Sequence, residues 1–144
     1  MTDRVREACE ACFDAYQNDC SGFARAVAAK FGITVRGQAN DIADTLAQQQ
    51  ESWRRLADGP AAAASAKAGK LVFGALRGDR QAQPSEHGHV VVVVNGTLDR
   101  TYPHAYWGRL GGGGQKDKTV NYAWRTGDRD RVIYAEHDLP NALP

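Results

Sequence analysis

The residue whose surroundings best suit chemistry is Cys20, in the run Asn-Asp-Cys-Ser-Gly-Phe that spans residues 18–23. Asparagine and aspartate are helix-capping types, so Cys20 is predicted to lie in the first turn of a helix. There the unpaired backbone N–H groups and the positive end of the helix dipole stabilise a thiolate. With a histidine nearby, the cysteine pKa can fall to roughly 3.5–7.5, which makes a nucleophile at neutral pH. Gly22 is expected to leave room beside the sulfur. A cysteine at a helix start, taken alone, also fits a structural role.

Two histidines precede the most apolar run of the chain, in the order His87-Gly88-His89-Val90. A histidine at the mouth of a rigid strand can be held against a thiol on a helix that packs across the sheet. Neighbouring side chains of a strand alternate between its faces, and a flexible glycine separates His87 from His89, so only one of the two histidines is expected to point into a cleft. His89 is predicted to be the general base, and His87 is interpreted as a surface residue of a loop.

The other two cysteines, Cys9 and Cys12, have the spacing of a redox motif or a zinc knuckle, but no second pair of ligands follows them. An odd total of three cysteines argues against a disulfide framework. Cys9 and Cys12 are therefore interpreted as small apolar residues on one face of a helix. No metal or cofactor is expected.

Composition limits the function classes. The 144 residues fit one domain, 1–144, and 42% hydrophobic content describes an ordinary globular protein. A net charge of +1, with scattered Lys and Arg, argues against nucleic-acid binding. Residues 1–10 lack the apolar run of a secretory signal, and Val90–Val94 is too short to span a bilayer. We expect a monomer that is made in the cytoplasm and does not bind membranes.

Helical spacing dominates the first half of the chain. Residues 3–16, which contain no Gly or Pro, predict a first helix. Phe23, Val27 and Phe31 recur at i, i+4 and i+8 and predict a second helix, which Gly32 would end. A third helix is predicted after Asn40, with an inner face made of Ile42, Leu46 and Trp53.

The run Asp58-Gly59-Pro60 is expected to break the third helix, and residues 61–68 could form a short helix or a loop. Short β-branched runs then predict strands at 71–73, 90–94, 120–124 and 132–135. Asn95-Gly96 is a strong hairpin signal, while segments 80–86 and 111–114 are expected to be loops. Helices first and strands afterwards predict an α+β domain, with helices on one side of a short antiparallel sheet.

Several of these motifs together resemble a known family. Asp-Cys-Ser-Gly-Phe on a helix, Gly-Lys-Leu-Val-Phe at 69–73 and Gly-His-Val-Val-Val at 88–92 resemble the NlpC-type papain-like cysteine peptidases. The match is closer to the type VI secretion amidase effectors of the first Tae family. It includes the Arg-Gly-Gln-Ala-Asn turn at 36–40 and Asp-Arg-Asp-Arg at 128–131, and it extends from about Glu7 to Tyr134.

This resemblance implies a minimal papain-like fold with Cys20 and His89 as the catalytic pair and the Cys20 backbone in the oxyanion hole. It implies hydrolysis of the γ-D-glutamyl–meso-diaminopimelate bond of peptidoglycan stem peptides. Papain-like enzymes usually orient the histidine with a third polar group, for which His104 is the best candidate, although a backbone carbonyl could serve.

The resemblance also implies a context. The type VI secretion apparatus would deliver the protein into the periplasm of a target bacterium, and a cognate immunity protein would protect the producer. Two alternatives stay open: a housekeeping or phage-derived wall hydrolase with the same chemistry, and a catalytically silent wall-binding module.

Overall fold

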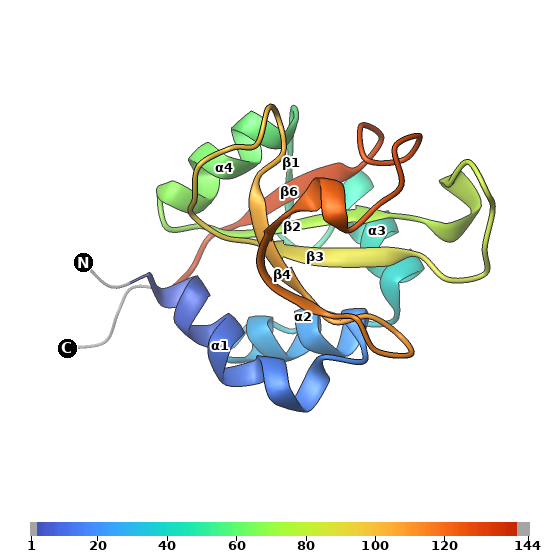
Figure 1. The fold of residues 1–144 in the computed structure, drawn as a ribbon. Helices are drawn as coiled ribbons and strands as arrows, with labels where there is room; N and C mark the ends of the chain where they lie inside the picture. Colours follow the sequence, from blue (N-terminus) through green and yellow to red (C-terminus); the bar gives the residue numbers. More distant parts are fainter. Residues whose placement is uncertain (1–2, 141–144) are drawn as a thin grey trace.

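The computed structural model describes residues 3–140, which form four α-helices and one six-stranded sheet (Figure 1). The helices are α1 (Arg4–Tyr16), α2 (Cys20–Ala29), α3 (Ala39–Ala47) and α4 (Gly59–Lys67). The strands are β1 (Arg54–Leu56), β2 (Leu71–Leu76), β3 (His89–Val93), β4 (His104–Trp107), β5 (Gln115–Thr119) and β6 (Ile133–His137). The predicted α+β class is confirmed.

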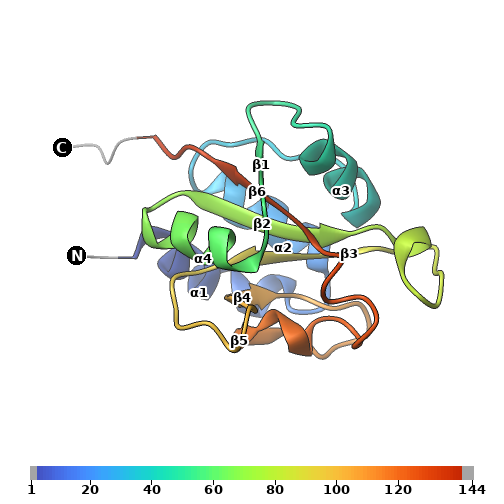
Figure 2. The same cartoon turned by 90° about the horizontal axis from the view of Figure 1, so that it is seen from above.

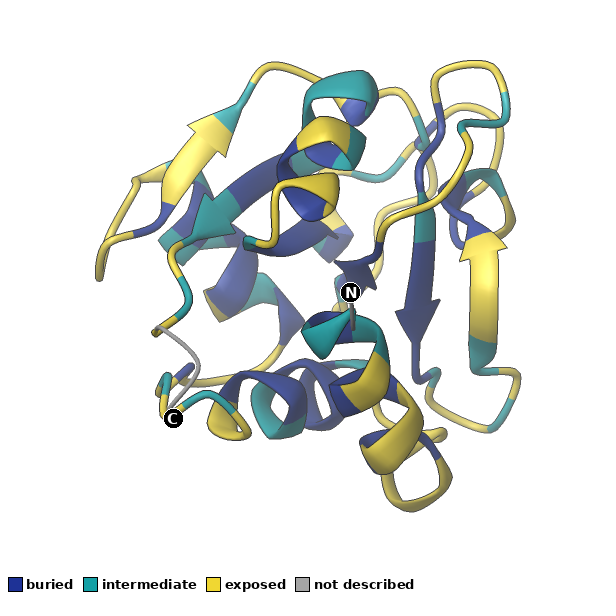
Figure 3. Ribbon diagram, turned by 90° about the vertical axis from the view of Figure 1, so that its left-hand side faces the viewer, coloured by how far each residue is buried: buried dark blue, intermediate teal, exposed yellow. Residues whose placement is uncertain are grey.

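The sheet has the order β1-β6-β2-β3-β4-β5, and every neighbouring pair is antiparallel. Its centre is buried on both faces, since every residue of β2 and β3 is buried. Buried residues accordingly gather between the helices and the central strands (Figure 3). Within residues 3–140, no helix combines the length and the apolar character needed to cross a membrane.

Helices cover both faces of the sheet, so the expectation of helices on one side was wrong. Helices α1, α2 and α3 pack on the face that presents Phe73, Val90 and Val92. Helix α4 packs on the other face, against Val72 and Val91. The views from the side and from above show α4 on the opposite side of the sheet from α1 and α2 (Figures 1 and 2). Consecutive strand residues point to opposite faces, so the unbroken apolar runs of β2 and β3 require cover on both sides.

Local capping explains the helix starts. Asp3, Asp19 and Asp58 are the N-caps of α1, α2 and α4, and each side chain accepts a hydrogen bond from a backbone N–H of the first turn. The run expected to break the third helix therefore begins a fourth, in which Pro60 needs no N–H in the first turn. This answers the open question about residues 61–68 in favour of a helix.

Three further predictions were wrong in detail. Residues 120–122 form a short 3₁₀ helix instead of a strand, and the polar segment before them forms edge strand β5. Trp53 lies beyond α3 but is buried, with its ring 4.7 Å from that of Phe73. Asn95-Gly96 is not a two-residue hairpin, because the chain reverses further on, where Asp99 and Tyr102 exchange two backbone hydrogen bonds.

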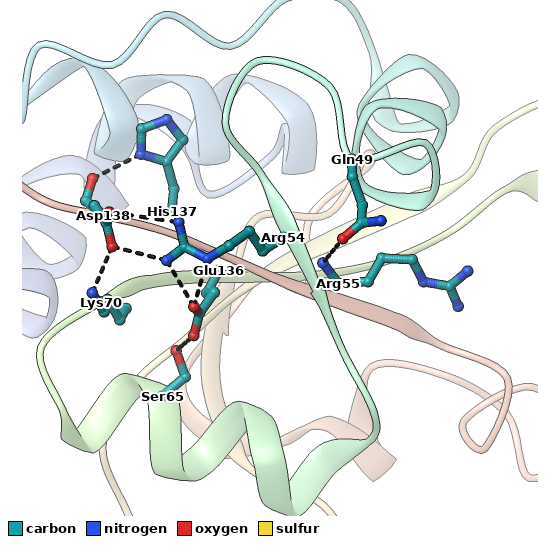
Figure 4. A network of polar contacts seen from close by, with 8 residues as sticks. All are labelled: Gln49, Arg54, Arg55, Ser65, Lys70, Glu136, His137 and Asp138. Carbon is teal, nitrogen blue, oxygen red and sulfur yellow. Dashed lines mark hydrogen bonds and ion pairs between the residues drawn. The ribbon is translucent and has the colours of Figure 1, made fainter.

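A polar network joins the far edge of the sheet to α4 (Figure 4). Arg54 of β1 contacts Glu136 at 2.7 Å and Asp138 at 2.8 Å, and Lys70 contacts Asp138 at 2.5 Å. The Ser65 hydroxyl of α4 donates to the other Glu136 oxygen at 2.7 Å. These contacts hold the short strand β1 against β6.

Candidate active site

Cys20 is the first residue of α2, as predicted, and Asp19 caps this helix. The Asp19 carboxylate accepts from the Gly22 N–H at 2.9 Å and from the Ser21 hydroxyl at 3.1 Å. A Cβ atom on Gly22 would lie 2.3 Å from an Asp19 oxygen. The glycine thus makes room for the capping carboxylate, and not for the sulfur as the sequence suggested.

His89 is the first residue of β3 and lies opposite Leu76 of β2. Two tryptophans pack edge-on with its ring: Trp124 at 5.2 Å and Trp107 at 6.3 Å between ring centroids. The side chain is buried, and among the described residues its Nε2 atom has no hydrogen-bond partner. Aromatic packing therefore orients the imidazole in this structure.

Cys20 and His89 line the same cleft, whose volume is about 820 Å³. Its walls come from the starts of α2 and α3, from the segment 81–89 and from Arg109, which follows β4. His87 also borders the cleft but is exposed, so the expectation that only one of the two histidines would face it was wrong. The structure brings the nucleophile and the base candidates together from elements far apart in the sequence.

Burial sets the protonation of this pair. Desolvation raises the pKa of Cys20, although the backbone amides of Val90 and Ser21 and the charge of Arg109 act against it. Desolvation also lowers the pKa of His89 to about 3, and the Arg109 charge adds to this shift. Both shifts favour a neutral thiol beside a neutral imidazole. The ready-made thiolate expected from the sequence is therefore not the form that the substrate-free site favours.

Asn40 fixes part of the wall of the cleft that Cys20 also lines. Its amide donates to the Glu86 carbonyl at 2.9 Å, and its Oδ1 accepts from the Gly78 N–H at 2.9 Å. A Cβ atom at Gly88 would lie 2.6 Å from the same oxygen. Helix α3 is thereby tied to both ends of the segment that leads to His89. The sequence placed Asn40 only at a helix start and gave no sign of this role.

A second, smaller cavity of about 370 Å³ adjoins the cleft, and His89 and Arg109 border both. Trp124 and Asp128 line the smaller cavity. Asp128 is buried and accepts from the Ala82 N–H at 2.7 Å, which anchors the segment before His89. The Asp-Arg-Asp-Arg motif that begins at Asp128 thus has a positioning role in this wall.

His104 does not line the cleft. It begins β4, and its carbonyl accepts from Val94 N–H, at the end of β3 opposite His89. Its Nδ1 lies 3.1 Å from the Asp117 carboxylate. The register that pairs Val92 with Tyr106 leads instead to Arg109 beside His89. The structure therefore gives no support to His104 as the third catalytic group.

Cys9 and Cys12 are buried free thiols on α1, in agreement with a packing role. Burial raises the pKa of both thiols, most strongly that of Cys9. Residues 3–140 contain no cluster of three His, Cys, Asp or Glu side chains able to hold a metal ion.

No family model matches the sequence. The chain is, however, similar to a known protein, the peptidoglycan amidase Tse1 of Pseudomonas aeruginosa, with 40% identity over 134 residues. The match covers 89% of this chain and 81% of Tse1. The chain belongs to the Tse1 amidase family. Membership confirms the expectation of a hydrolytic enzyme, while the roles of Cys20 and His89 remain predictions. Both residues of this Tse1-family chain line the same cleft.

Proposed function

We propose that this protein is a cysteine amidase that hydrolyses the peptide stems of bacterial peptidoglycan. One observation carries the proposal: Cys20, at the start of α2, and His89, at the start of β3, border one open cleft in a chain of the Tse1 amidase family. A nucleophile on a helix N-terminus beside a histidine is the arrangement that acyl transfer requires.

The first step forms a thioester. His89 is neutral in the substrate-free site, so its imidazole takes the Cys20 proton as the sulfur attacks the amide carbonyl. The Cys20 backbone N–H, which the helix itself does not use at this first position, helps to bind the developing oxyanion. The imidazolium then gives its proton to the departing amine, and the C–N bond breaks.

The second step returns the enzyme to its starting state. Water attacks the thioester carbonyl with His89 as general base, the C–S bond breaks and Cys20 recovers its proton. The imidazolium formed in each step stays packed edge-on with Trp124 and Trp107, whose ring centroids lie 5.2 and 6.3 Å from that of His89. His89, neutral at rest, carries the extra proton only from the attack in each step to the departure of the leaving group.

The bond that we assign is the one between γ-D-glutamate and meso-diaminopimelate. This assignment rests on the resemblance to the type VI secretion amidase effectors, carried by the motifs around Cys20 and His89. The same resemblance supports a single catalytic domain over residues 1–144, delivery by a type VI secretion apparatus into a target periplasm, and a cognate immunity protein that blocks the cleft.

Digestion of purified peptidoglycan, read by mass spectrometry, tests the activity and the bond together. Wild-type protein should release fragments that end at γ-D-glutamate. The Cys20→Ala and His89→Ala variants should lose several orders of magnitude in rate, as is usual for members of such a catalytic unit. His87→Ala, a change of an exposed histidine on the same cleft, should have a mild effect. Near-wild-type turnover by Cys20→Ala would refute the cysteine mechanism.

Expression in two compartments tests the delivery proposal. The protein should be harmless in the cytoplasm of a host with meso-diaminopimelate in its wall, and lytic when it is exported to the periplasm. Cys20→Ala exported in the same way should be harmless, which separates catalysis from export stress. Survival of hosts that export active protein would argue against the antibacterial role and would leave the amidase chemistry to be judged by the digest.

A further inference from the structure

Arg109 lies where the two cavities meet, and sequence motifs gave no indication of it. It borders both the larger cleft and the smaller cavity, as His89 does. The register between β3 and β4 brings Arg109 beside His89, and its charge acts on the pKa of both Cys20 and His89. A substrate whose amide bond reached Cys20 would therefore have Arg109 next to the groups around that bond.

The position of Arg109 is fixed by its backbone and by one side-chain contact. Its N–H donates to the Gln17 carbonyl at 2.9 Å, and its guanidinium donates to the Ala123 carbonyl at 2.7 Å. The preceding Gly108 is packed so closely that a Cβ atom would lie 2.2 Å from the Tyr16 carbonyl oxygen. The side chain is thus held in place while most of its N–H donors stay unused.

The charge of Arg109 is not neutralised within the described residues. Arg77, which also borders the cleft, contacts Asp44 at 2.5 Å and Asp79 at 2.9 Å. Arg25, a third arginine of the cleft, donates to the Gly37 carbonyl and, like Arg109, takes part in no ion pair of residues 3–140. Unlike Arg109, it does not border the smaller cavity that His89 lines. The ion pairs of residues 3–140 do not include Arg109, although it is half-buried beside the nucleophile. A half-buried, anchored guanidinium with free donors is suited to bind a carboxylate in a bidentate manner.

We propose that Arg109 determines substrate specificity by binding the free carboxylate on the acyl side of the scissile bond. This inference rests on the proposed function. A γ-glutamyl amide differs from an ordinary peptide because the glutamate α-carboxylate stays free, a few carbon atoms from the carbonyl that is attacked. With that carbonyl at Cys20, the carboxylate comes within reach of a cation that borders the same part of the cleft.

Paired stem peptides test this assignment. One carries γ-D-glutamate, and the other carries the corresponding α-carboxamide, which has nearly the same shape and no charge. Wild-type protein should cleave the carboxylate peptide with a kcat/KM at least about tenfold higher, the factor expected when a charge-assisted hydrogen bond is lost. Arg109→Gln should cleave both at similar rates, and Arg109→Lys should keep part of the preference.

The ratio of the two rates is the decisive quantity, because any effect of Arg109 on Cys20 or His89 changes both rates alike and cancels. Arg55→Gln, which removes an exposed arginine of β1 outside both cavities, is the control and should keep the wild-type ratio. Equal rates for wild type, or an unchanged ratio in Arg109→Gln, would overturn the inference. Loss of the ratio in Arg55→Gln would overturn it as well, by showing an effect of net charge. Failure of wild type to cleave either peptide would instead refute the proposed function.

Discussion

Replacing His89 by asparagine should make the stability of the protein less sensitive to mild acid. The folded protein holds His89 neutral, with a pKa of about 3 against an ordinary value of 6.5, because the side chain is buried. In the unfolded chain the same histidine takes up a proton as the pH falls below 6.5. The unfolded state then binds more protons than the folded state, so the free energy of unfolding decreases as the pH falls.

The size of this effect follows from the two pKa values. Each pH unit in which only the unfolded histidine is protonated costs about 1.4 kcal/mol. Between pH 7 and pH 5 the loss comes to about 2 kcal/mol, and any folded-state pKa below about 4 gives the same figure. Glu10, Glu136 and Asp138, whose carboxyl pKa values are lowered, lose their contribution only below their ordinary values of 4.5 or 3.8. Between pH 7 and pH 5, the change in the free energy of unfolding therefore comes from the protonation of histidine and not of these carboxyl groups.

Urea unfolding at pH 7 and at pH 5 measures the difference. Wild type should lose about 2 kcal/mol between the two, a large part of the stability of a small domain. His89→Asn should lose much less, and His87→Asn, which changes an exposed histidine two positions away, should behave like wild type. Equal losses in wild type and His89→Asn would show that His89 is not held neutral by burial. The protonation order used in the mechanism would then be wrong.

Three further substitutions test how the site is held. Trp124→Ala should lower kcat/KM roughly two- to tenfold by loosening the His89 ring, and Trp124→Phe should restore most of it, as steady-state assays on a stem peptide would show. Asp128→Ala should lower the free energy of unfolding in urea by about 1–3 kcal/mol, because it leaves the Ala82 N–H without its acceptor. An unchanged unfolding midpoint would contradict the anchoring role of Asp128. Gly22→Ala should displace the Asp19 carboxylate that caps α2 and lower the free energy of unfolding in urea by about 1 kcal/mol. A variant as stable as wild type would show that this cap is dispensable.

The sequence by itself determined the features that depend on neighbouring residues. The start of α2 at Cys20 follows from the capping aspartate before it and from apolar residues at helical spacing behind it. The unbroken valine run after His89 is typical of a buried strand. His89 was therefore expected at the start of that strand. The α+β class and the two principal site candidates were predictable for this reason.

Only the tertiary structure decided the features that depend on strand pairing and on the burial of side chains. Edge strand β5 is polar and mostly exposed, so it carries no apolar signal, while the apolar segment after it folds into a 3₁₀ helix that brings Trp124 to His89. The register between β3 and β4 decides that Arg109, and not His104, lies beside His89. Burial depends on the whole fold, and it is burial that makes the resting pair of Cys20 and His89 neutral.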